Sequence, residues 1–318
     1  MTGKKNMLEE TKRTHKNTYQ PSFIFSRYTM PHIDHPQRNE DSIFVDRHRG
    51  LAIVCDGIGG AQAGEVASQL AVQSIQQGWR QIIKQHTTKA NLLLAEGLNV
   101  PAILTQLVEG AQAAITGEGK RRAEQAERER KEVSYPGTTL AMVVLCRLEN
   151  GGYQLVHAHV GDSRIYFLRA EEPMKRLTQD DNYLATKVAE GSVTEEEAWY
   201  IDQAVRGEQL NEIERGYFNK RNGITQALSH PDPYLPEYLD IHVGEATLTA
   251  GDRILLCSDG IHDNLTDLEI EETLRYAPAS LVALRLVHQA GARSRENNSI
   301  VIRAKADDMS AIVVSCYT

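Results

Sequence analysis

The chain has 318 residues, of which 41% are hydrophobic and 25% are charged, the balance of an ordinary soluble globular protein. Its formal net charge of −8 argues against a nucleic-acid-binding protein, because such domains usually carry a basic patch. No run approaches the roughly 18 consecutive apolar residues of a membrane-spanning helix, so no contact with a membrane is expected either.

Residues 1–20 are polar and show no hydrophobic periodicity, which predicts a flexible N-terminal arm. No apolar stretch follows their positive charges, so we expect neither a signal peptide nor export, and a cytoplasmic location follows. The four cysteines are far apart and form no CxxC pair. They are expected to be reduced core residues rather than zinc ligands.

The first half of the folded chain begins with strands and then becomes helical. Short segments rich in Ile, Val and Phe predict strands at 22–30, 42–46 and 50–56. Apolar residues at helical spacing then predict a helix over 64–85 and a second helix after Pro101. The charged stretch 117–134 mixes both signs, which is typical of a solvated helix extension.

The second half returns to strands, followed by helices and one last strand. Strands are predicted at 138–148, 153–161, 164–170, 238–243, 252–259 and 309–318, and helices at 266–276 and 279–292. Residues 179–222 are polar and helical in composition. Because strands and helices do not alternate one by one, we expect antiparallel sheets with segregated helices, an α+β domain over 21–318.

Acidic residues recur at the ends of these predicted strands. They occur in Asn39-Glu40-Asp41, Asp56-Gly57, Gly161-Asp162, Ser258-Asp259-Gly260 and Asp307-Asp308. Any one of these is more often a plain turn than a ligand, since Asp-Gly is a common turn dipeptide. Together they predict carboxylates that converge on hard cations, Mn²⁺ or Mg²⁺, because converging buried carboxylates repel one another unless cations neutralise them.

Six segments in order are similar to the motifs of the protein phosphatase 2C family, the metal-dependent PPM serine/threonine phosphatases, and most similar to its bacterial branch. They are RNEDS (38–42), VCDGIGG (54–60), PGTTL (136–140), VGDSRIY (160–166), LLCSDG (255–260) and DDMSAIVV (307–314). The resemblance covers essentially the whole folded chain. It implies a four-layer αββα sandwich of two antiparallel sheets flanked by helices.

The resemblance also implies a role for each acidic position. Asp56 is expected to bridge two metal ions, Gly57 to bind one through its carbonyl, and Asp259 and Asp307 to complete the direct ligands. Glu40 and Asp41 are expected to hold metal-bound waters, and Asp162 to hold a third, weaker ion with Asp259. Ser163 and Arg164 are expected to be structural. The implied reaction is direct attack of a metal-bridging water or hydroxide on phosphorus.

The sequence departs from the family at four places. Ile58 stands where many eukaryotic members have a histidine proposed as general acid, so no side chain is assigned that role. Pro36 replaces the usual phosphate-gripping arginine; Arg38 either grips phosphate from a shifted turn or faces solvent. The usual Asp-Asn pair reads Asp307-Asp308. The segment 179–229 matches the family's flap but is longer than expected, and it either affects substrate choice or is a surface insertion.

Three functions stay open at this stage. The favoured one is an active protein phosphatase that acts on phosphorylated protein substrates and is linked to a serine/threonine kinase in signalling. A catalytically silent member that binds a phosphoprotein or a regulator is the second. A phosphatase or phosphodiesterase for small molecules, using the same metals, is the third.

Overall fold

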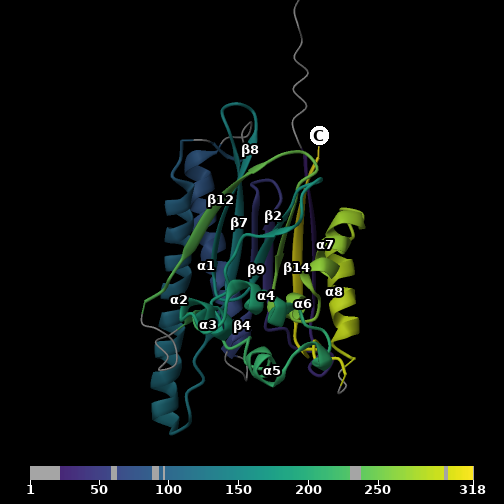
Figure 1. The fold of residues 1–318 in the computed structure, drawn as a ribbon. Helices are drawn as coiled ribbons and strands as arrows, with labels where there is room; N and C mark the ends of the chain where they lie inside the picture. The colour runs from purple at the N-terminus through teal and green to yellow at the C-terminus, as the bar shows by residue number, and fades with distance from the viewer. Residues whose placement is uncertain are drawn as a thin grey trace, which may run out of the picture.

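Two antiparallel sheets lie face to face in the computed structural model, and helices cover the outer face of each (Figure 1). The structure describes residues 22–58, 63–87, 93–95, 97–229, 238–296 and 300–317. The predicted arm at 1–20 lies outside the described residues. The four layers confirm the predicted α+β sandwich.

The first sheet has five strands in the order β1-β14-β13-β9-β10. Their bounds are β1 Ser22–Met30, β14 Met309–Tyr317, β13 Arg253–Cys257, β9 Arg164–Leu168 and β10 Lys175–Arg176. The long helices α7 (Asp267–Tyr276) and α8 (Val282–Arg293) cover its outer face, and the short helix α6 (Asp259–His262) follows β13 directly. The first and last strands of the described chain therefore pair with each other.

The second sheet runs in the order β12-β8-β7-β3-β2, and the short strand β5 pairs with β7 in parallel. Their bounds are β12 His242–Leu248, β8 Tyr153–Val160, β7 Leu140–Arg147, β3 Leu51–Cys55, β2 Ser42–Asp46 and β5 Leu94–Ala95. Helices α1 (Ala63–His86) and α2 (Val100–Glu129) cover its outer face.

Three apolar layers hold the four structural layers together. One lies between α1 and α2 and the second sheet, and includes Trp79. Another lies between the two sheets, where Val54 and Ile312 pack from opposite sides. The third lies between the first sheet and α7 and α8, and includes Leu286. The central strands of both sheets are buried along almost their whole length, so their ends are fixed in space.

Smaller elements close one end of the sandwich. A three-stranded sheet has the order β11-β6-β4, with bounds β11 Leu228–Ser229, β6 Gly137–Thr138 and β4 Gly57–Ile58. Nearby are α3 (Tyr183–Ala189), α4 (Glu195–Gln203), the 3₁₀ turn η1 (Gly207–Gln209) and α5 (Glu212–Phe218). These helices share a small core of their own around Ile201 and Phe218.

Most predicted elements are found within a few residues of their expected ends. The predicted strand 238–243 was displaced, because β12 runs from His242 to Leu248. Burial alternates along this strand, whose sequence is His-Val-Gly-Glu-Ala-Thr-Leu. Polar and apolar residues do not alternate with the same two-residue period, so the sequence does not mark the strand. Helix α2 continues to Glu129, which confirms a helical extension, and Glu118 pairs within it with Arg121 and Arg122.

Two further features of the described residues bear on the environment of the chain. All four cysteines are buried and free. Among the helices that the structure describes, none combines the length and the apolar character needed to cross a bilayer.

The two tryptophans provide a matched test of this packing. Trp79 is 1% exposed beneath the second sheet, whereas Trp199 on α4 is 59% exposed. We expect Trp79→Ala to lower the free energy of unfolding by about 3–5 kcal/mol, because it leaves a cavity in a closed core. Trp199→Ala should cost less than about 0.5 kcal/mol. Denaturant titration measures both, and equal losses would contradict the assignment of the core.

Candidate active site

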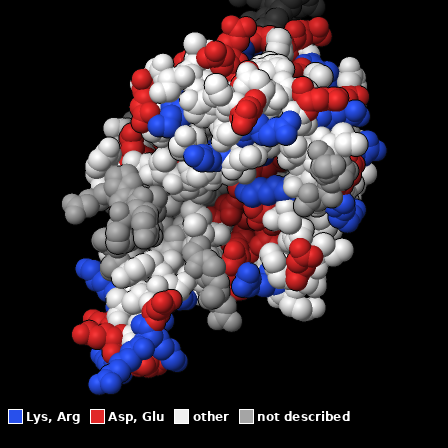
Figure 2. Space-filling view, turned by 60° about the horizontal axis from the view of Figure 1, so that its bottom comes forward, with Lys and Arg blue, Asp and Glu red and all other residues white. Residues whose placement is uncertain are grey.

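The acidic turns meet because the strands that carry them end at the same end of the sandwich. In the second sheet Ser42 lies opposite Cys55, which brings the neighbouring Asp41 and Asp56 together. In the first sheet Cys257 lies opposite both Arg164 and Ala311, which gathers the segments before β9, before β14 and after β13. Figure 2 shows acidic side chains gathered in a hollow of this end, with Lys and Arg side chains at its margin.

Asp56 is fixed by hydrogen bonds on both sides of its backbone. Its N–H donates to the Thr139 hydroxyl at 3.0 Å, and its carbonyl accepts from Thr139 N–H at 2.8 Å and from the Thr138 hydroxyl at 2.8 Å. Thr139 Oγ1 lies 2.7 Å from Ser163 Oγ, so the same threonine reaches the turn that carries Asp162. The turn after β3 and the turn between β8 and β9 are thereby joined through one threonine.

Gly57 allows the closest backbone approach in this region. Any Cβ on it would overlap the backbone of Gly64 in α1 and of Glu40. Neither neighbour is the end of a flexible side chain, so only glycine lets the three segments meet without a shift. The close approach brings the start of α1 and the Glu40 segment against the Asp56 turn.

Asp41 joins the two sheets. Its Oδ2 accepts a hydrogen bond from Ser258 Oγ at 2.7 Å, and Ser258 Oγ accepts from the N–H of Ser310 at 3.0 Å. One carboxylate at the start of β2 therefore touches the end of β13 and the start of β14. This contact brings the acidic turns of one sheet to those of the other.

Asp308 takes a structural role that the sequence did not reveal. Its two carboxylate oxygens accept backbone N–H bonds from His32 at 2.8 Å and from Glu40 at 2.6 Å. It thereby ties the loop that carries Arg38 and Glu40 to the start of β14. The carboxylate of Asp307 beside it lies 2.9 Å from the ammonium of Lys305, and its charge helps to raise the pKa of Asp41 and of Asp56.

Asp259 and Asp162 lie on adjacent turns of the first sheet. Asp259 is the first residue of α6, and His262 on the same helix makes a 3.0 Å hydrogen bond from Nε2 to the Asp162 carbonyl. Burial raises the pKa of the Asp162 carboxyl well above its usual value, and the neighbouring charge of Asp259 raises it further. Both carboxylates therefore sit in a place that disfavours a bare negative charge.

The same conflict exists at Asp56. Burial is the main cause that raises the pKa of the Asp56 carboxyl well above its usual value, and three neighbouring carboxylates add to it, namely Asp41, Asp259 and Asp307. One oxygen of each of Asp41, Asp162 and Asp259 is buried and accepts no hydrogen bond. Unpartnered buried oxygens are costly, so these three point to a cation as their partner.

Lys305 is the site residue that the sequence analysis missed. Its ammonium contacts Asp259, lies 2.9 Å from Asp307 Oδ2 and lies 3.1 Å from Asp263 Oδ2. Burial lowers the pKa of this lysine, but the three carboxylates outweigh it and hold the pKa well above its usual value. The only signal in the sequence is its place two residues before Asp307.

The donor set fits a hard divalent cation. It consists of carboxylate oxygens together with backbone carbonyls, the ligands that Mg²⁺ and Mn²⁺ prefer. As the described residues stand, no group of three His, Cys, Asp or Glu side chains encloses a point where an ion would sit. The ammonium of Lys305 lies between Asp259 and Asp307 and contacts both carboxylates.

Arg38 lies beside the acidic residues rather than away from them. Its Nη2 is 3.5 Å from Glu40 Oε1, and its buried Nε makes no hydrogen bond. A backbone turn closes from His35 to Arg38 at 2.9 Å and contains Pro36. The shifted turn thus presents a guanidinium with unused donors at the edge of the acidic hollow.

The segment 179–229 is anchored to the site by buried ion pairs. Arg164 is 2% exposed and contacts Asp180 at 2.6 Å and Asp202 at 3.2 Å. Arg221 contacts Asp263 of the turn after α6 at 3.3 Å. Breaking a buried pair leaves an uncompensated charge, so these contacts hold the segment against both the Asp162 turn and α6. Arg164 is structural, as expected from its motif.

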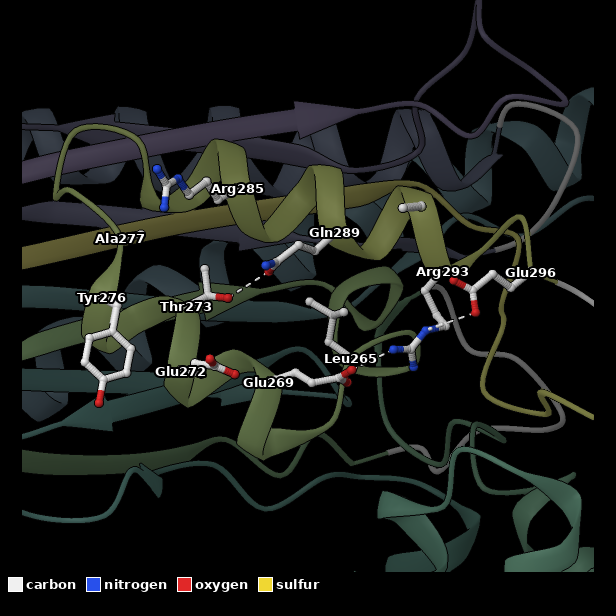
Figure 3. Close-up of a pocket in the computed structure, with 11 residues that line it drawn as sticks. Leu265, Glu269, Glu272, Thr273, Tyr276, Ala277, Arg285, Gln289, Arg293 and Glu296 are labelled. Carbon is white, nitrogen blue, oxygen red and sulfur yellow. Dashed lines mark hydrogen bonds and ion pairs between the residues drawn. The ribbon is translucent and has the colours of Figure 1, made fainter.

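A second hollow lies between α7 and α8 (Figure 3). It has a volume of about 450 Å³. Four of its polar side chains pair with one another, because Arg293 contacts Glu269 at 2.6 Å and Thr273 donates to Gln289 at 2.7 Å. No side chain there shows the unpartnered buried oxygens of the acidic hollow, so we assign the active site to the latter.

A comparison with known families decides what kind of site this is. The sequence profile of protein phosphatase 2C matches residues 30–295. The chain belongs to the protein phosphatase 2C family. The match spans the acidic turns at 40–41, 56, 162 and 259, which confirms the resemblance read from the motifs.

Individual relatives agree with this protein phosphatase 2C assignment. The serine/threonine protein phosphatase PstP of Mycobacterium tuberculosis is 32% identical over 276 residues, which cover 85% of this chain and 42% of that protein. Protein phosphatase PhpP of Streptococcus pneumoniae is 27% identical over 237 residues, which cover 74% of this chain and 77% of that protein. This chain thus spans less than half the length of the mycobacterial relative.

A solved structure of this family supports the fold in detail. The catalytic domain of serine/threonine protein phosphatase PstP in complex with two manganese ions superposes with a TM-score of 0.64 at 26% identity. The alignment covers 94% of this chain and all of that one.

The contact at Gly57 yields a matched test. We expect Gly57→Ala to destabilise the protein by about 1–3 kcal/mol, because the new methyl group forces the backbone of α1 and of the Glu40 segment apart. Gly117→Ala is the control, because Gly117 lies in α2 with open space around its Cα, and there alanine should stabilise by up to about 1 kcal/mol. Thermal unfolding measures both. Equal melting temperatures for the two variants would contradict the close approach.

Proposed function

We propose that the chain is a metal-dependent protein serine/threonine phosphatase that hydrolyses phosphoserine and phosphothreonine. The observation that carries the proposal is the set of buried carboxylate oxygens of Asp41, Asp162 and Asp259 that have no hydrogen-bond partner, which bound cations would neutralise. The names of its relatives, a serine/threonine protein phosphatase and a protein phosphatase, support the choice of substrate.

The residues would share two Mn²⁺ or Mg²⁺ ions as follows. Asp56, the Gly57 carbonyl, Asp259 and Asp307 would hold the two ions directly, with Asp56 shared between them. Glu40 and Asp41 would hold the surrounding waters. Asp162, with Asp259, would hold a third and weaker ion. The two manganese ions in the PstP catalytic domain support the pair.

Such ions, when bound, supply a water of lowered pKa and neutralise the charge that develops on the phosphoryl oxygens. The residues of the protein hold the proposed metal ligands in position. Thr138 and Thr139 fix the backbone of Asp56, and Ser258 fixes Asp41. Ile58 carries no proton donor, so protonation of the seryl or threonyl leaving oxygen falls to solvent.

Arg38 grips the phosphate in this proposal. Its guanidinium has a buried Nε without a hydrogen bond and lies within 3.5 Å of Glu40, at the edge of the hollow. A planar guanidinium binds two phosphate oxygens at once, which suits a phosphoryl group held against the metal site.

The substrates are phosphorylated proteins in this proposal, and their phosphates are supplied by a serine/threonine kinase. The segment 179–229 lies against the site through Arg164 and Arg221 and would contact the protein part of the substrate. The four buried free cysteines suit a reducing compartment, which supports a cytoplasmic place of action.

The central assignment is tested at Asp56. We expect Asp56→Asn to lower kcat more than about 100-fold in Mn²⁺, since residues that merely support metal ligands already cost about 10–100-fold. Asp34→Asn is the control, because the Asp34 side chain is 78% exposed, and it should keep full activity. Turnover of a phosphothreonine peptide and of p-nitrophenyl phosphate is measured for each.

The same assay separates the competing functions. An active protein phosphatase prefers the phosphopeptide. Turnover of p-nitrophenyl phosphate without turnover of the peptide would favour a small-molecule phosphatase. An intact wild-type chain that turns over neither substrate in Mn²⁺ would favour a silent, phosphoprotein-binding module.

Arg38 is tested by its effect on substrate binding. We expect Arg38→Ala to raise KM for the phosphopeptide roughly 10-fold or more, because charge-assisted hydrogen bonds to phosphate contribute about 1.5–3 kcal/mol. Arg38→Lys should recover part of the loss. Arg47→Ala, at an exposed arginine in the turn after β2, is the control. An unchanged KM in Arg38→Ala would remove Arg38 from the site.

A further inference from the structure

Lys305 reaches the acidic hollow from a backbone that is fixed on both sides. The buried side chain of Asn264 accepts from the Lys305 N–H at 2.9 Å and donates to its carbonyl at 3.0 Å. The lysine side chain is 28% exposed, so most of it lies within the protein. The fixed backbone therefore directs the ammonium into the hollow.

The three carboxylates around this ammonium differ in their other partners. Asp259 and Asp307 are proposed metal ligands, and Asp259 keeps one buried oxygen without a hydrogen bond. Asp263 is not a proposed ligand, and it also binds Arg221 at 3.3 Å and the side-chain amide of Asn222. The ammonium thus bridges the proposed metal site and a carboxylate that stands outside it.

We propose that Lys305 is a built-in competitor of the metal ions, which neutralises Asp259 and Asp307 when no metal is bound and must leave them when metal binds. The inference rests on the proposed function, because it takes these two aspartates as ligands.

The charges require this competition. An ammonium and a divalent ion that share the same carboxylates repel each other at a few ångströms, and each weakens the hold of the carboxylates on the other. The ammonium lies 2.9 Å from Asp307 Oδ2. If it stayed there while that oxygen bound a metal ion, the two cations would repel each other.

Asp263 supplies the place to which the ammonium withdraws. It is 1% exposed and already lies 3.1 Å from Lys305 Nζ, so a small rotation of the lysine side chain keeps one ion pair while it frees two ligands. The lysine charge is never left without a partner, which keeps the cost of the exchange low.

The proposal predicts opposite effects of one substitution on the metal-free and the metal-bound protein. We expect Lys305→Met to bind Mn²⁺ about tenfold more tightly or better, because the competing charge is gone. Without metal, the same variant should melt several degrees below the wild type, because Asp259 and Asp307 then lack their cation. Isothermal titration with Mn²⁺ and thermal unfolding in a chelator measure the two effects.

Two control variants isolate the charge. Lys187 on α3 has a side chain about as exposed as that of Lys305 and pairs with Glu190 at 2.6 Å. Lys187→Met should leave the Mn²⁺ affinity unchanged. Lys305→Arg keeps a positive charge and should bind Mn²⁺ no more tightly than the wild type. If Lys305→Arg bound Mn²⁺ as tightly as Lys305→Met does, the positive charge at position 305 would have no role in the competition.

The remaining outcomes also decide the matter. Equal or weaker Mn²⁺ binding by Lys305→Met would overturn the proposal. If that variant unfolds without metal, recovery on addition of Mn²⁺ supports the proposal, and failure to recover contradicts it. If the wild type, Asp56→Asn and Lys305→Met all fail to bind Mn²⁺, the proposed function fails rather than this inference alone.

Discussion

The central physical constraint on this protein is the mutual repulsion among carboxylates that the fold brings together. Asp41, Asp56, Asp162 and Asp259 come from four separate turns, and burial raises the pKa of each carboxyl. The apolar layers of the sandwich supply the free energy that holds these turns at one end. The acidic hollow is therefore a strained arrangement that the rest of the protein stabilises and that a bound cation relieves.

Hydrogen bonds between the two sheets make this arrangement stable enough to persist. The Asp41–Ser258–Ser310 chain and the Thr139–Ser163 contact each join turns from different strands. None of these serines and threonines is charged, so they add rigidity without adding repulsion. Together they place the proposed ligands before any ion arrives, which is the preorganisation that catalysis by metal ions needs.

Much of the fold and of the proposed ligand set was readable from the sequence, because apolar periodicity marks the strands and the acidic turns follow them. The order of strands within each sheet, the small sheet around Gly57 and the start of β12 were not predicted. These depend on pairing between distant residues, for which a single sequence gives no signal. Asp308 and Lys305 were missed for the same reason: their roles come from contacts with His32 and Glu40, and with Asp259 and Asp263.

The segment 179–229 and the proposed metal site are connected by one set of buried charges. Asp263 binds both Arg221 of that segment and Lys305 of the hollow. Arg164, which lies two residues after Asp162 in the chain, binds Asp180 and Asp202 of the segment. A change in the charge of the hollow therefore reaches the segment through direct contacts.

The most direct test is a crystal structure of the protein grown in manganese, with anomalous scattering measured at the manganese edge. Two peaks about 3.5–4 Å apart, both in contact with Asp56 and flanked by Asp259 and Asp307, are the predicted result. An acidic hollow without anomalous peaks at saturating manganese, with those three carboxylates turned away from one another, would contradict the account.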